Sequence, residues 1–279
     1  MLDNTSEQLN RQGNEYFSRG NYTEAYVCYA QALECDRQTG DRRALVATLG
    51  NLGNICAVSG RRDQAQNYYQ EVLELQKILG DQRGIGTTLA NLGNLRADAG
   101  EWERARAYYL EAQDIMEQSG DDHGKAVLFS DLGLVARETG QFDEALRFYE
   151  RSLELMRRTG NQGGMTDAWR MMARTYVMQK RYEEALACCR TSLAIAERIH
   201  DELRIGGAWY LMAQAYEEQG HVKEAAELLE KVVKVDQKYG LPKLRENTIR
   251  LNVLRARLER PNGSTTAVDE TVGKRASGS

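Results

Sequence analysis

Proline is scarce in this 279-residue chain, where it occurs only twice, against about 5% of residues in average proteins. So little proline is not expected in a loop-rich β fold, and it indicates a mostly helical chain. No run of about 18 apolar residues occurs, so no membrane-spanning helix is expected. The first residues lack the basic and apolar regions of a signal peptide. We therefore expect a cytoplasmic protein that does not bind a membrane.

Cysteine and histidine are also few, with five and three residues respectively. An odd number of cysteines cannot all pair within the chain, and Cys28 and Cys35 lie too far apart along a helix for a disulfide. No cysteine or histidine pair has the spacing of a zinc site. The buried, reduced state is expected for the cysteines, and no metal or cofactor is expected.

Basic charge is not in excess, because the formal net charge is -4. A nucleic-acid binder would normally show a strongly basic balance, so none is expected. The segment 120–126 is similar to a phosphate-binding loop, but it has one residue too few between its glycines and Ala126 in place of Ser or Thr. No nucleophile, base and acid can be nominated together. We predict that the chain is not an enzyme.

What the chain does have is a glycine every twenty residues, and a repeat of forty residues follows from it. The glycines are Gly20, Gly40, Gly60, Gly80, Gly100, Gly120, Gly140 and Gly160, then Gly220 and Gly240. Their spacing predicts helix stops in the left-handed conformation. Asp41, Asp81 and Asp121 follow three of them as N-caps. Lys180 and His200 break the series, so the least ideal turns are expected there.

Residues forty positions apart form columns of similar chemistry. Two columns hold only small residues: Gly13, Gly53, Gly93, Gly133, Ala173 and Ala213 in one, and Ala25, Ala65, Ala105, Ala145, Ala185 and Ala225 in the other. Glycine inside a helix costs about 1 kcal/mol relative to alanine. Close approach between helices is the expected compensation, so a bulkier residue should overpack these positions by roughly 1–3 kcal/mol.

The spacing of apolar residues between the glycines is helical and predicts six helix pairs. The expected repeats lie near 5–40, 41–80, 81–120, 121–160, 161–200 and 201–240. A capping helix over 242–260 is expected to cover the last pair. These elements make one all-α domain over 1–260. The polar segment 261–279 is expected to be disordered.

The columns resemble the tetratricopeptide repeat. Repeat one supplies Leu9, Gly13, Tyr16, Gly20, Ala25, Tyr29 and Ala32, and repeat six supplies Trp209, Met212, Ala213, Tyr216, Gly220, Ala225, Leu229 and Val232. The repeat here is forty residues long instead of the usual 34 of that family, and the proline near the end of its second helix is missing. The Asn-Leu-Gly-Asn segments 51–54 and 91–94 are similar to those of Pins-type adaptors and of bacterial tetratricopeptide proteins. The resemblance implies a right-handed α-solenoid whose first helices line a concave face.

First-helix side chains not needed for packing are the candidate binding residues. Asn14, Asn51, Asn54, Asn91 and Asn94 offer both donor and acceptor, which suits the backbone of an extended peptide. Hydrogen bonding between adjacent repeats, or duplication of repeats two and three, would equally explain them.

Charged and polar side chains continue this wall in the last two repeats. Arg170 and Arg174 are one turn apart and could fork onto a partner's carboxylate. Pairing with Asp167 or Glu184, or plain solvation, is the alternative. Gln214 continues the wall in repeat six.

These observations favour a non-catalytic scaffold that binds a segment of a partner protein in its concave groove. Two alternatives stay open. One is a self-assembling scaffold that captures further copies of itself. The other is a receptor or regulatory module for a signalling peptide or small ligand; such receptors usually carry an effector domain, which is not expected because about five residues precede the first repeat. Fold alone cannot name the partner.

Overall fold

The computed structural model describes residues 2–259, and this part of the chain contains thirteen helices and no strand. The helices are α1 (Leu2–Ser18), α2 (Tyr22–Thr39), α3 (Arg42–Val58), α4 (Arg62–Leu79), α5 (Gln82–Ala97), α6 (Trp102–Ser119), α7 (Asp122–Glu138), α8 (Phe142–Arg158), α9 (Gln162–Met178), α10 (Tyr182–Arg198), α11 (Glu202–Glu218), α12 (Val222–Tyr239) and α13 (Leu244–Glu259). Six consecutive pairs and a final single helix confirm the all-α solenoid of the prediction. The expected disordered segment 261–279 lies outside the described residues.

The first helix of each later repeat begins at a side-chain cap. The Asp41 carboxylate accepts hydrogen bonds from the backbone N–H groups of Arg43 and Ala44. The capping residues of the following first helices are Asp81, Asp121, Asn161 and Asp201, each of which accepts one backbone N–H bond. These bonds satisfy amide groups that a helix start leaves without an internal partner. The second helices lack such a bond, so tertiary packing must fix where they begin.

The glycines that recur every twenty residues adopt the left-handed backbone conformation, with φ between 62° at Gly240 and 82° at Gly220. Lys180 and His200 occupy the same place with φ of 59° and 55°, and they are the only non-glycine residues with positive φ in the described chain. A side chain at such a position strains the backbone. The prediction that the fifth repeat has the two least ideal turns is confirmed in its geometry.

Small residues in the first helices make room for a tyrosine of their own repeat. A Cβ atom added to Gly53 would lie 2.5 Å from the Tyr69 ring, and one added to Gly93 would lie 2.4 Å from the Tyr109 ring. Gly13 and Gly133 make the same contact with the tyrosines of repeats one and four. The expectation of close packing is confirmed, but the neighbour is an aromatic ring and not the backbone of another helix.

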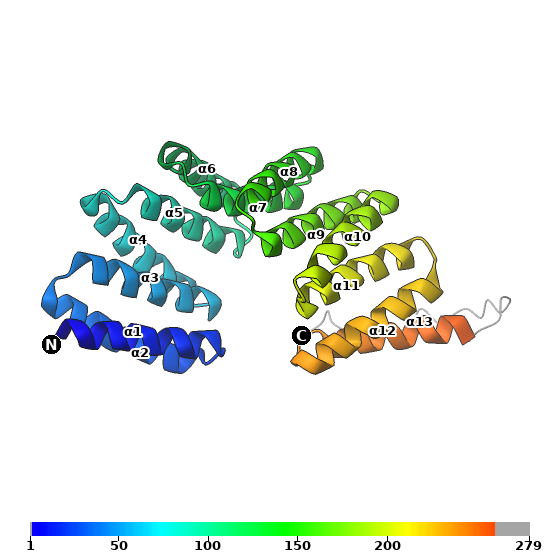
Figure 1. Cartoon of the computed structure of the whole chain (residues 1–279), viewed down its shortest axis with the longest axis horizontal. Coiled ribbons are helices and arrows are strands. Elements are labelled where there is room, and N and C mark those ends of the chain that lie inside the picture. The colour runs from blue at the N-terminus through cyan, green and yellow to red at the C-terminus, as the bar shows by residue number, and fades with distance from the viewer. Residues whose placement is uncertain (1, 260–279) are drawn as a thin grey trace, which may run out of the picture.

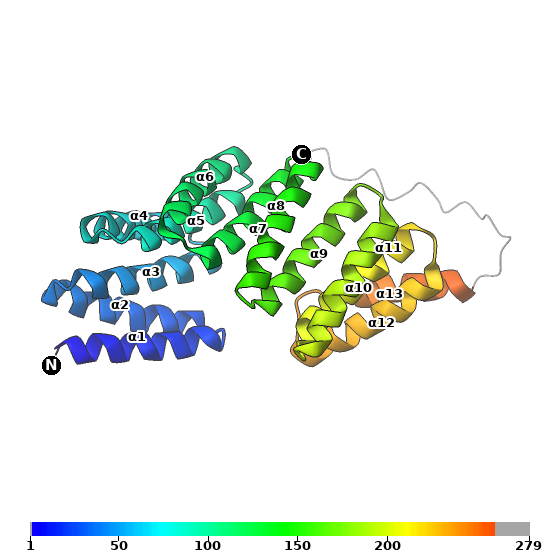
Figure 2. The ribbon, with the colours of Figure 1, turned by 45° about the horizontal axis from the view of Figure 1, so that its top comes forward.

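The helix pairs follow one another along an arch (Figure 1). The two ends of the arch face each other across its open side, and α7 lies nearer that side than α6 and α8. Successive first helices contact each other, as in α1 with α3, α7 with α9 and α9 with α11. No comparable contact joins successive second helices within residues 2–259. The first helices therefore line the inner wall, where neighbouring repeats approach most closely. Figure 2 shows the same succession from a tilted direction.

The largest buried cluster is continuous across repeats three to five and reaches Leu211 of repeat six. Separate clusters lie at the two ends, one around Leu49 and Leu52 and one around Leu229. The capping helix α13 buries Leu251 and Leu254 in this last cluster. It thereby covers apolar surface that the last repeat of an open solenoid would otherwise expose.

Polar contacts join adjacent repeats near the two ends of the solenoid. The buried Asp36 carboxylate accepts hydrogen bonds from the Ser6 hydroxyl and, at 2.6 Å, from the Thr48 hydroxyl. At the other end, Asn247 donates to the buried Asp236 carboxylate at 2.7 Å. The corresponding column is apolar in the middle of the chain, at Met116 and Met156. Among the described helices, none is long and apolar enough to cross a membrane.

Candidate binding groove

Three of the candidate asparagines accept hydrogen bonds from buried tyrosines. The Tyr29 hydroxyl donates to Asn14 Oδ1 at 2.7 Å. The same bond links Tyr69 to Asn54 at 2.7 Å and Tyr109 to Asn94 at 2.5 Å. These asparagines are nevertheless exposed on the inner wall. Their oxygen atoms thus serve the fold, while their amide N–H groups make no hydrogen bond to any other described residue.

The other two asparagines lie together with Asn54 at one pocket. Its volume is about 410 Å³, and Asn51, Asn54 and Asn91 line it between repeats two and three. Asn51 also donates to Asn10 Oδ1 of the preceding repeat at 3.2 Å. The half-buried Asn91 makes no side-chain hydrogen bond within the described part of the chain. Inter-repeat bonding therefore accounts for Asn51 and leaves Asn91 available to a ligand.

The asparagine pattern ends at repeat four, where Leu134 occupies the column of Asn14, Asn54 and Asn94. Tyr149 remains completely buried, and its hydroxyl group has no hydrogen-bond partner. Burial raises the pKa of Tyr149 to about 12. Half-buried Asp131 lies on α7, the helix that carries Leu134, and burial raises the pKa of its carboxyl group to about 7. Asp131 forms no ion pair with any described residue.

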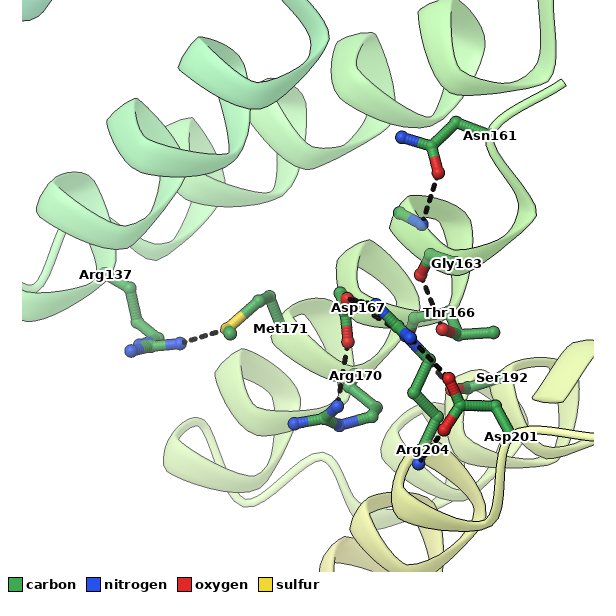
Figure 3. Close-up of polar contacts among 11 residues, drawn as sticks. Arg137, Asn161, Gly163, Thr166, Asp167, Arg170, Met171, Ser192, Asp201 and Arg204 are labelled. Atoms are coloured by element: carbon green, nitrogen blue, oxygen red, sulfur yellow. Dashed lines mark hydrogen bonds and ion pairs between the residues drawn. The ribbon is translucent and has the colours of Figure 1, made fainter. Parts of the chain in front are cut away.

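Arg170 belongs to an ion-pair network between α9 and α11 (Figure 3). Its Nη1 atom lies 2.8 Å from Asp167 Oδ1, and Arg204 Nη2 lies 2.9 Å from Asp167 Oδ2. Arg204 also pairs with Asp201 at 2.5 Å. Arg170 thus pairs with Asp167, which was the alternative to binding a partner's carboxylate. Its Nε atom, however, is buried without a hydrogen-bond partner.

Arg174 and Gln214 differ from Arg170 in how they are held. Arg174 is exposed and has no ion pair with any described residue, so its whole guanidinium group is available. Gln214 donates to Glu218 at 3.1 Å on its own helix. The structure brings Arg170 and Arg174 together at one pocket, whereas Gln214 does not line it.

This second pocket, which we call the cap pocket, has a volume of about 430 Å³ and lies between α9, α11, α12 and the start of α13. Its charged and polar lining residues are Arg170, Arg174, Tyr210, Asp236, Lys243 and Asn247. Its apolar lining residues are Met171, Leu203, Leu211, Val232, Val235, Leu241 and Pro242. Apolar walls with a few convergent polar groups are typical of ligand sites.

Sequence reasoning did not nominate Asp236, Asn247 or Asp131. The sequence did contain a signal for Asp236. Its column is acidic only at its two ends, and the members are Asp36, Gln76, Met116, Met156, Ala196 and Asp236. Asn247 lies beyond the last repeat, so no column could place it. Asp131 was visible as a single acid in a column that holds Asn51 and Asn91, but its burial depends on packing between repeats.

Within residues 2–259, nothing in the geometry indicates a nucleophile or a metal centre. Burial raises the pKa of Cys188 to about 11 and that of Cys189 to about 12. Their thiols are therefore protonated at neutral pH and weakly nucleophilic. No cluster of potential metal ligands was found among the described residues.

The repeat geometry agrees with a comparison of the chain with family models. A tetratricopeptide repeat model matches residues 7–78, 84–158 and 165–238, and a second tetratricopeptide repeat model matches residues 130–198. The chain therefore belongs to the tetratricopeptide repeat family, which is generally a non-catalytic protein-interaction fold. The resemblance drawn from the columns is confirmed at this level, and the finer likeness to Pins-type adaptors stays a prediction. Among curated proteins, no sequence matches the chain.

Solved structures of low sequence identity share the fold. BtubC (BKLC) from P. vanneervenii is 16% identical, with a TM-score of 0.60 over 96% of this chain and 97% of that one. A Rap protein complexed with Competence and Sporulation Factor is 14% identical, with a TM-score of 0.67 over 90% and 74%. The Cut9–Hcn1 assembly of APC/C contains a chain that is 16% identical, with a TM-score of 0.67 over 92% of this chain and 43% of that one.

Proposed function

We propose that the protein is a non-catalytic scaffold that binds a segment of a partner protein along its inner wall. The observation that carries the proposal is the set of unused donors there. Asn14, Asn54 and Asn94 are each fixed by a tyrosine through the oxygen atom, so each amide group is held in place with its N–H donors free. Donors at regular spacing suit the carbonyl groups of an extended backbone.

Charge supports a direction for the bound segment. Asn51, Asn54 and Asn91 provide uncharged polar groups on the wall of repeats two and three, where Arg83 of the same pocket is paired with Asp121. Arg174 adds a free positive charge in repeat five, and Arg170 adds a buried, unpaired Nε. An acidic side chain of the partner would therefore be favoured near repeat five, and this would fix the register of binding.

Partners of other members of the fold are consistent with this role. The Rap protein was solved in complex with Competence and Sporulation Factor, and Cut9 was solved in a hetero-tetramer with Hcn1. Self-assembly and signal-peptide reception stay predictions for this chain. Light scattering after gel filtration addresses the first, because a constant monomer mass over a wide concentration range would contradict it.

Affinity capture with quantitative mass spectrometry tests the groove. The wild type is compared with Arg170→Ala/Arg174→Ala and with Asn54→Asp/Asn94→Asp. Aspartate keeps an oxygen acceptor for the tyrosine and removes the N–H donors. We expect both double variants to lose the same specifically captured partner by at least about tenfold, equivalent to about 1.4 kcal/mol.

The matched control is Tyr69→Phe/Tyr109→Phe, which removes the tyrosine hydroxyls and leaves both carboxamides. It should retain the partner if the amide donors act directly, although the asparagines become less constrained. Recovery of every partner at wild-type level by both groove variants would contradict the proposal. Circular dichroism of each variant checks that the helices are retained.

A further inference from the structure

The cap pocket contains a buried oxygen atom, Asn247 Oδ1, that has no hydrogen-bond partner. Asn247 is only 2% exposed, and its Nδ2 donates to Asp236 Oδ2. This bond fixes the orientation of the carboxamide, since the opposite orientation would place two oxygen atoms against each other. Asn247 Oδ1 is left buried without a hydrogen bond. An unpaired acceptor of this kind is costly in a folded protein and calls for a ligand or another explanation.

Comparison with the other end of the solenoid shows what is missing around Asp236. Asp36 occupies the same column and uses both oxygens, one with Ser6 and one with Thr48. The residue in the Ser6 column of repeat six is Gly206. Asp236 Oδ1 therefore lacks the hydroxyl donor that Asp36 has, and no other described residue donates to it. The missing side chain also opens the space that becomes the pocket, because Gly206 lines it.

The groups in the pocket divide into two zones. Asp236 and Asn247 are buried and present two acceptors, one of them on a carboxylate. Arg174 and Lys243 are exposed, and both line the same pocket. Lys243 Nζ lies 5.4 Å from the centre of the Tyr210 ring, so it interacts with the ring face instead of an acid. The buried zone thus requires a donor, preferably a cation, and the exposed zone favours an anion.

A ligand that satisfies both zones carries a positive and a negative group on an apolar body. A simple cation would be repelled by the arginine and lysine side chains, and a simple anion would leave the buried acceptors unpaired. Val232, Val235 and Leu241 form an apolar wall between the zones. A volume of about 430 Å³ lies within the ~300–1,000 Å³ typical of small-ligand pockets.

We propose that the cap pocket binds the α-ammonium group of an apolar residue, with a neighbouring carboxylate toward Arg174 and Lys243. Asp236 and Asn247 accept its N–H donors, and the apolar side chain packs against Val232 and Val235. A free apolar amino acid and the first residue of a short acidic peptide share this chemistry. The site shares Arg174 with the proposed groove, but the groups assigned to the ammonium, Asp236 and Asn247, are not part of that groove.

Isothermal titration of the full chain with four probes tests the ligand chemistry. The probes are L-leucine, leucyl-glutamate, N-acetyl-L-leucine and L-leucinamide. We expect saturable binding of leucine or leucyl-glutamate, and at least a tenfold loss on N-acetylation. Preference for leucine identifies a free amino acid as the ligand, and preference for leucyl-glutamate identifies a peptide terminus. Binding of none of the probes, or equal binding of the acetylated one, would overturn the proposal.

Variants test the residues assigned to the ammonium group. Gly206→Ser introduces the hydroxyl that Asp36 receives from Ser6, and it should abolish binding by satisfying Asp236 and filling the space. A Cβ there would lie 3.1 Å from Val235 Cγ1, so the isosteric Asp236→Asn provides a second variant with less steric change. It should weaken binding at least tenfold.

Asp36→Asn is the matched control, because it makes the same change in the same column outside the cap pocket. It should leave probe binding within about twofold of wild type. Unchanged binding by both Gly206→Ser and Asp236→Asn would overturn the assignment, as would an equal loss in Asp36→Asn. If no probe binds the cap pocket but Asn54→Asp/Asn94→Asp still loses the captured partner, the scaffold role stands, because Asn54 and Asn94 lie in other repeats.

Discussion

Tyr149 is a buried tyrosine without a hydrogen bond because Leu134 occupies the position at which the three preceding repeats carry an asparagine. In those repeats the tyrosine hydroxyl donates to Asn14, Asn54 or Asn94. The ring still packs in the space above Gly133. Repeat four therefore keeps the packing of the tyrosine ring on the glycine and lacks the hydrogen bond between the tyrosine hydroxyl and an asparagine.

Phenylalanine should thus have opposite effects in adjacent repeats. Tyr109→Phe removes a hydrogen bond and should lower the free energy of unfolding by about 0.5–1.5 kcal/mol. Tyr149→Phe removes an unpaired buried hydroxyl and should leave stability unchanged or raise it by up to about 1 kcal/mol. Urea unfolding followed by circular dichroism measures both. A larger loss in Tyr149→Phe than in Tyr109→Phe would contradict the explanation.

Glycines of one helix should respond differently to the same substitution. Gly53→Ala places a Cβ atom 2.5 Å from the Tyr69 ring and should destabilise by roughly 1–3 kcal/mol. Gly50→Ala, one turn earlier, meets nothing within 4 Å and should stabilise by up to about 1 kcal/mol through helix propensity. Thermal unfolding of the two variants side by side makes the comparison. Equal shifts would show that the tyrosine contact is not the reason for glycine at position 53.

The two non-glycine turns of repeat five offer sites for stabilisation. Lys180→Gly and His200→Gly relieve a left-handed backbone at φ of 59° and 55°, and each should gain about 0.5–1 kcal/mol after the entropy cost of glycine. Gly160→Ala, at φ of 70°, is the reverse control and should lose about 1 kcal/mol. Denaturant midpoints provide the readout. Destabilisation by both glycine variants would contradict the strain argument.

Asp131 should make stability depend on pH in an unusual direction. Burial raises the pKa of its carboxyl group to about 7, above the value of about 3.9 in an unfolded chain. The folded state therefore binds a proton more tightly, and stability falls as pH rises from about 4 to 7. Asp131→Asn introduces the residue that repeats two and three have in this column, at Asn51 and Asn91. The variant should not lose stability as the pH rises.

The variant should thus be more stable than wild type by roughly 1–3 kcal/mol at pH 8 and nearly equal to it at pH 4. Unfolding curves at the two pH values measure the difference. Asn91→Asp is the converse control, since it places an acid in the same column one repeat earlier. An advantage of Asp131→Asn that is equal at both pH values would exclude titration as its cause.

Most of the fold could be predicted from the sequence because the ends of the helices and the starts of the later first helices have local causes, whereas the second helices begin without a side-chain cap. Glycine at positions 60 and 100 ends a helix, and aspartate at 41 and 81 begins one, so these boundaries follow from local residues. The capping helix begins at Leu244 instead of near 242, since Pro242 and Lys243 form part of the turn. Neither the period nor the caps depend on contacts distant in sequence.

The binding residues were less readable, because their roles depend on which atom of a side chain is already bonded. Asn54 was identified as an inner-wall residue, but only the structure shows that its oxygen accepts from Tyr69 while its N–H groups are free. Arg170 and Arg174 look alike in sequence, and only Arg170 is tied to an acid. The cap pocket arises from an absent side chain at Gly206, which a search for functional groups overlooks.

The continuous apolar cluster from Ile85 to Leu211 has a mechanical consequence. Repeats three to five share this interior, which also reaches Leu211 of repeat six, so bending between them would expose apolar surface to water. The first repeats and the capped end have interiors of their own. Smaller buried clusters fill the seams between repeats two and three and between repeats five and six, so bending at these seams would expose less apolar surface. The width of the arch should therefore change by rotation of the terminal repeats relative to a rigid middle. Bound segments of different thickness could then be accommodated without repacking repeats three to five.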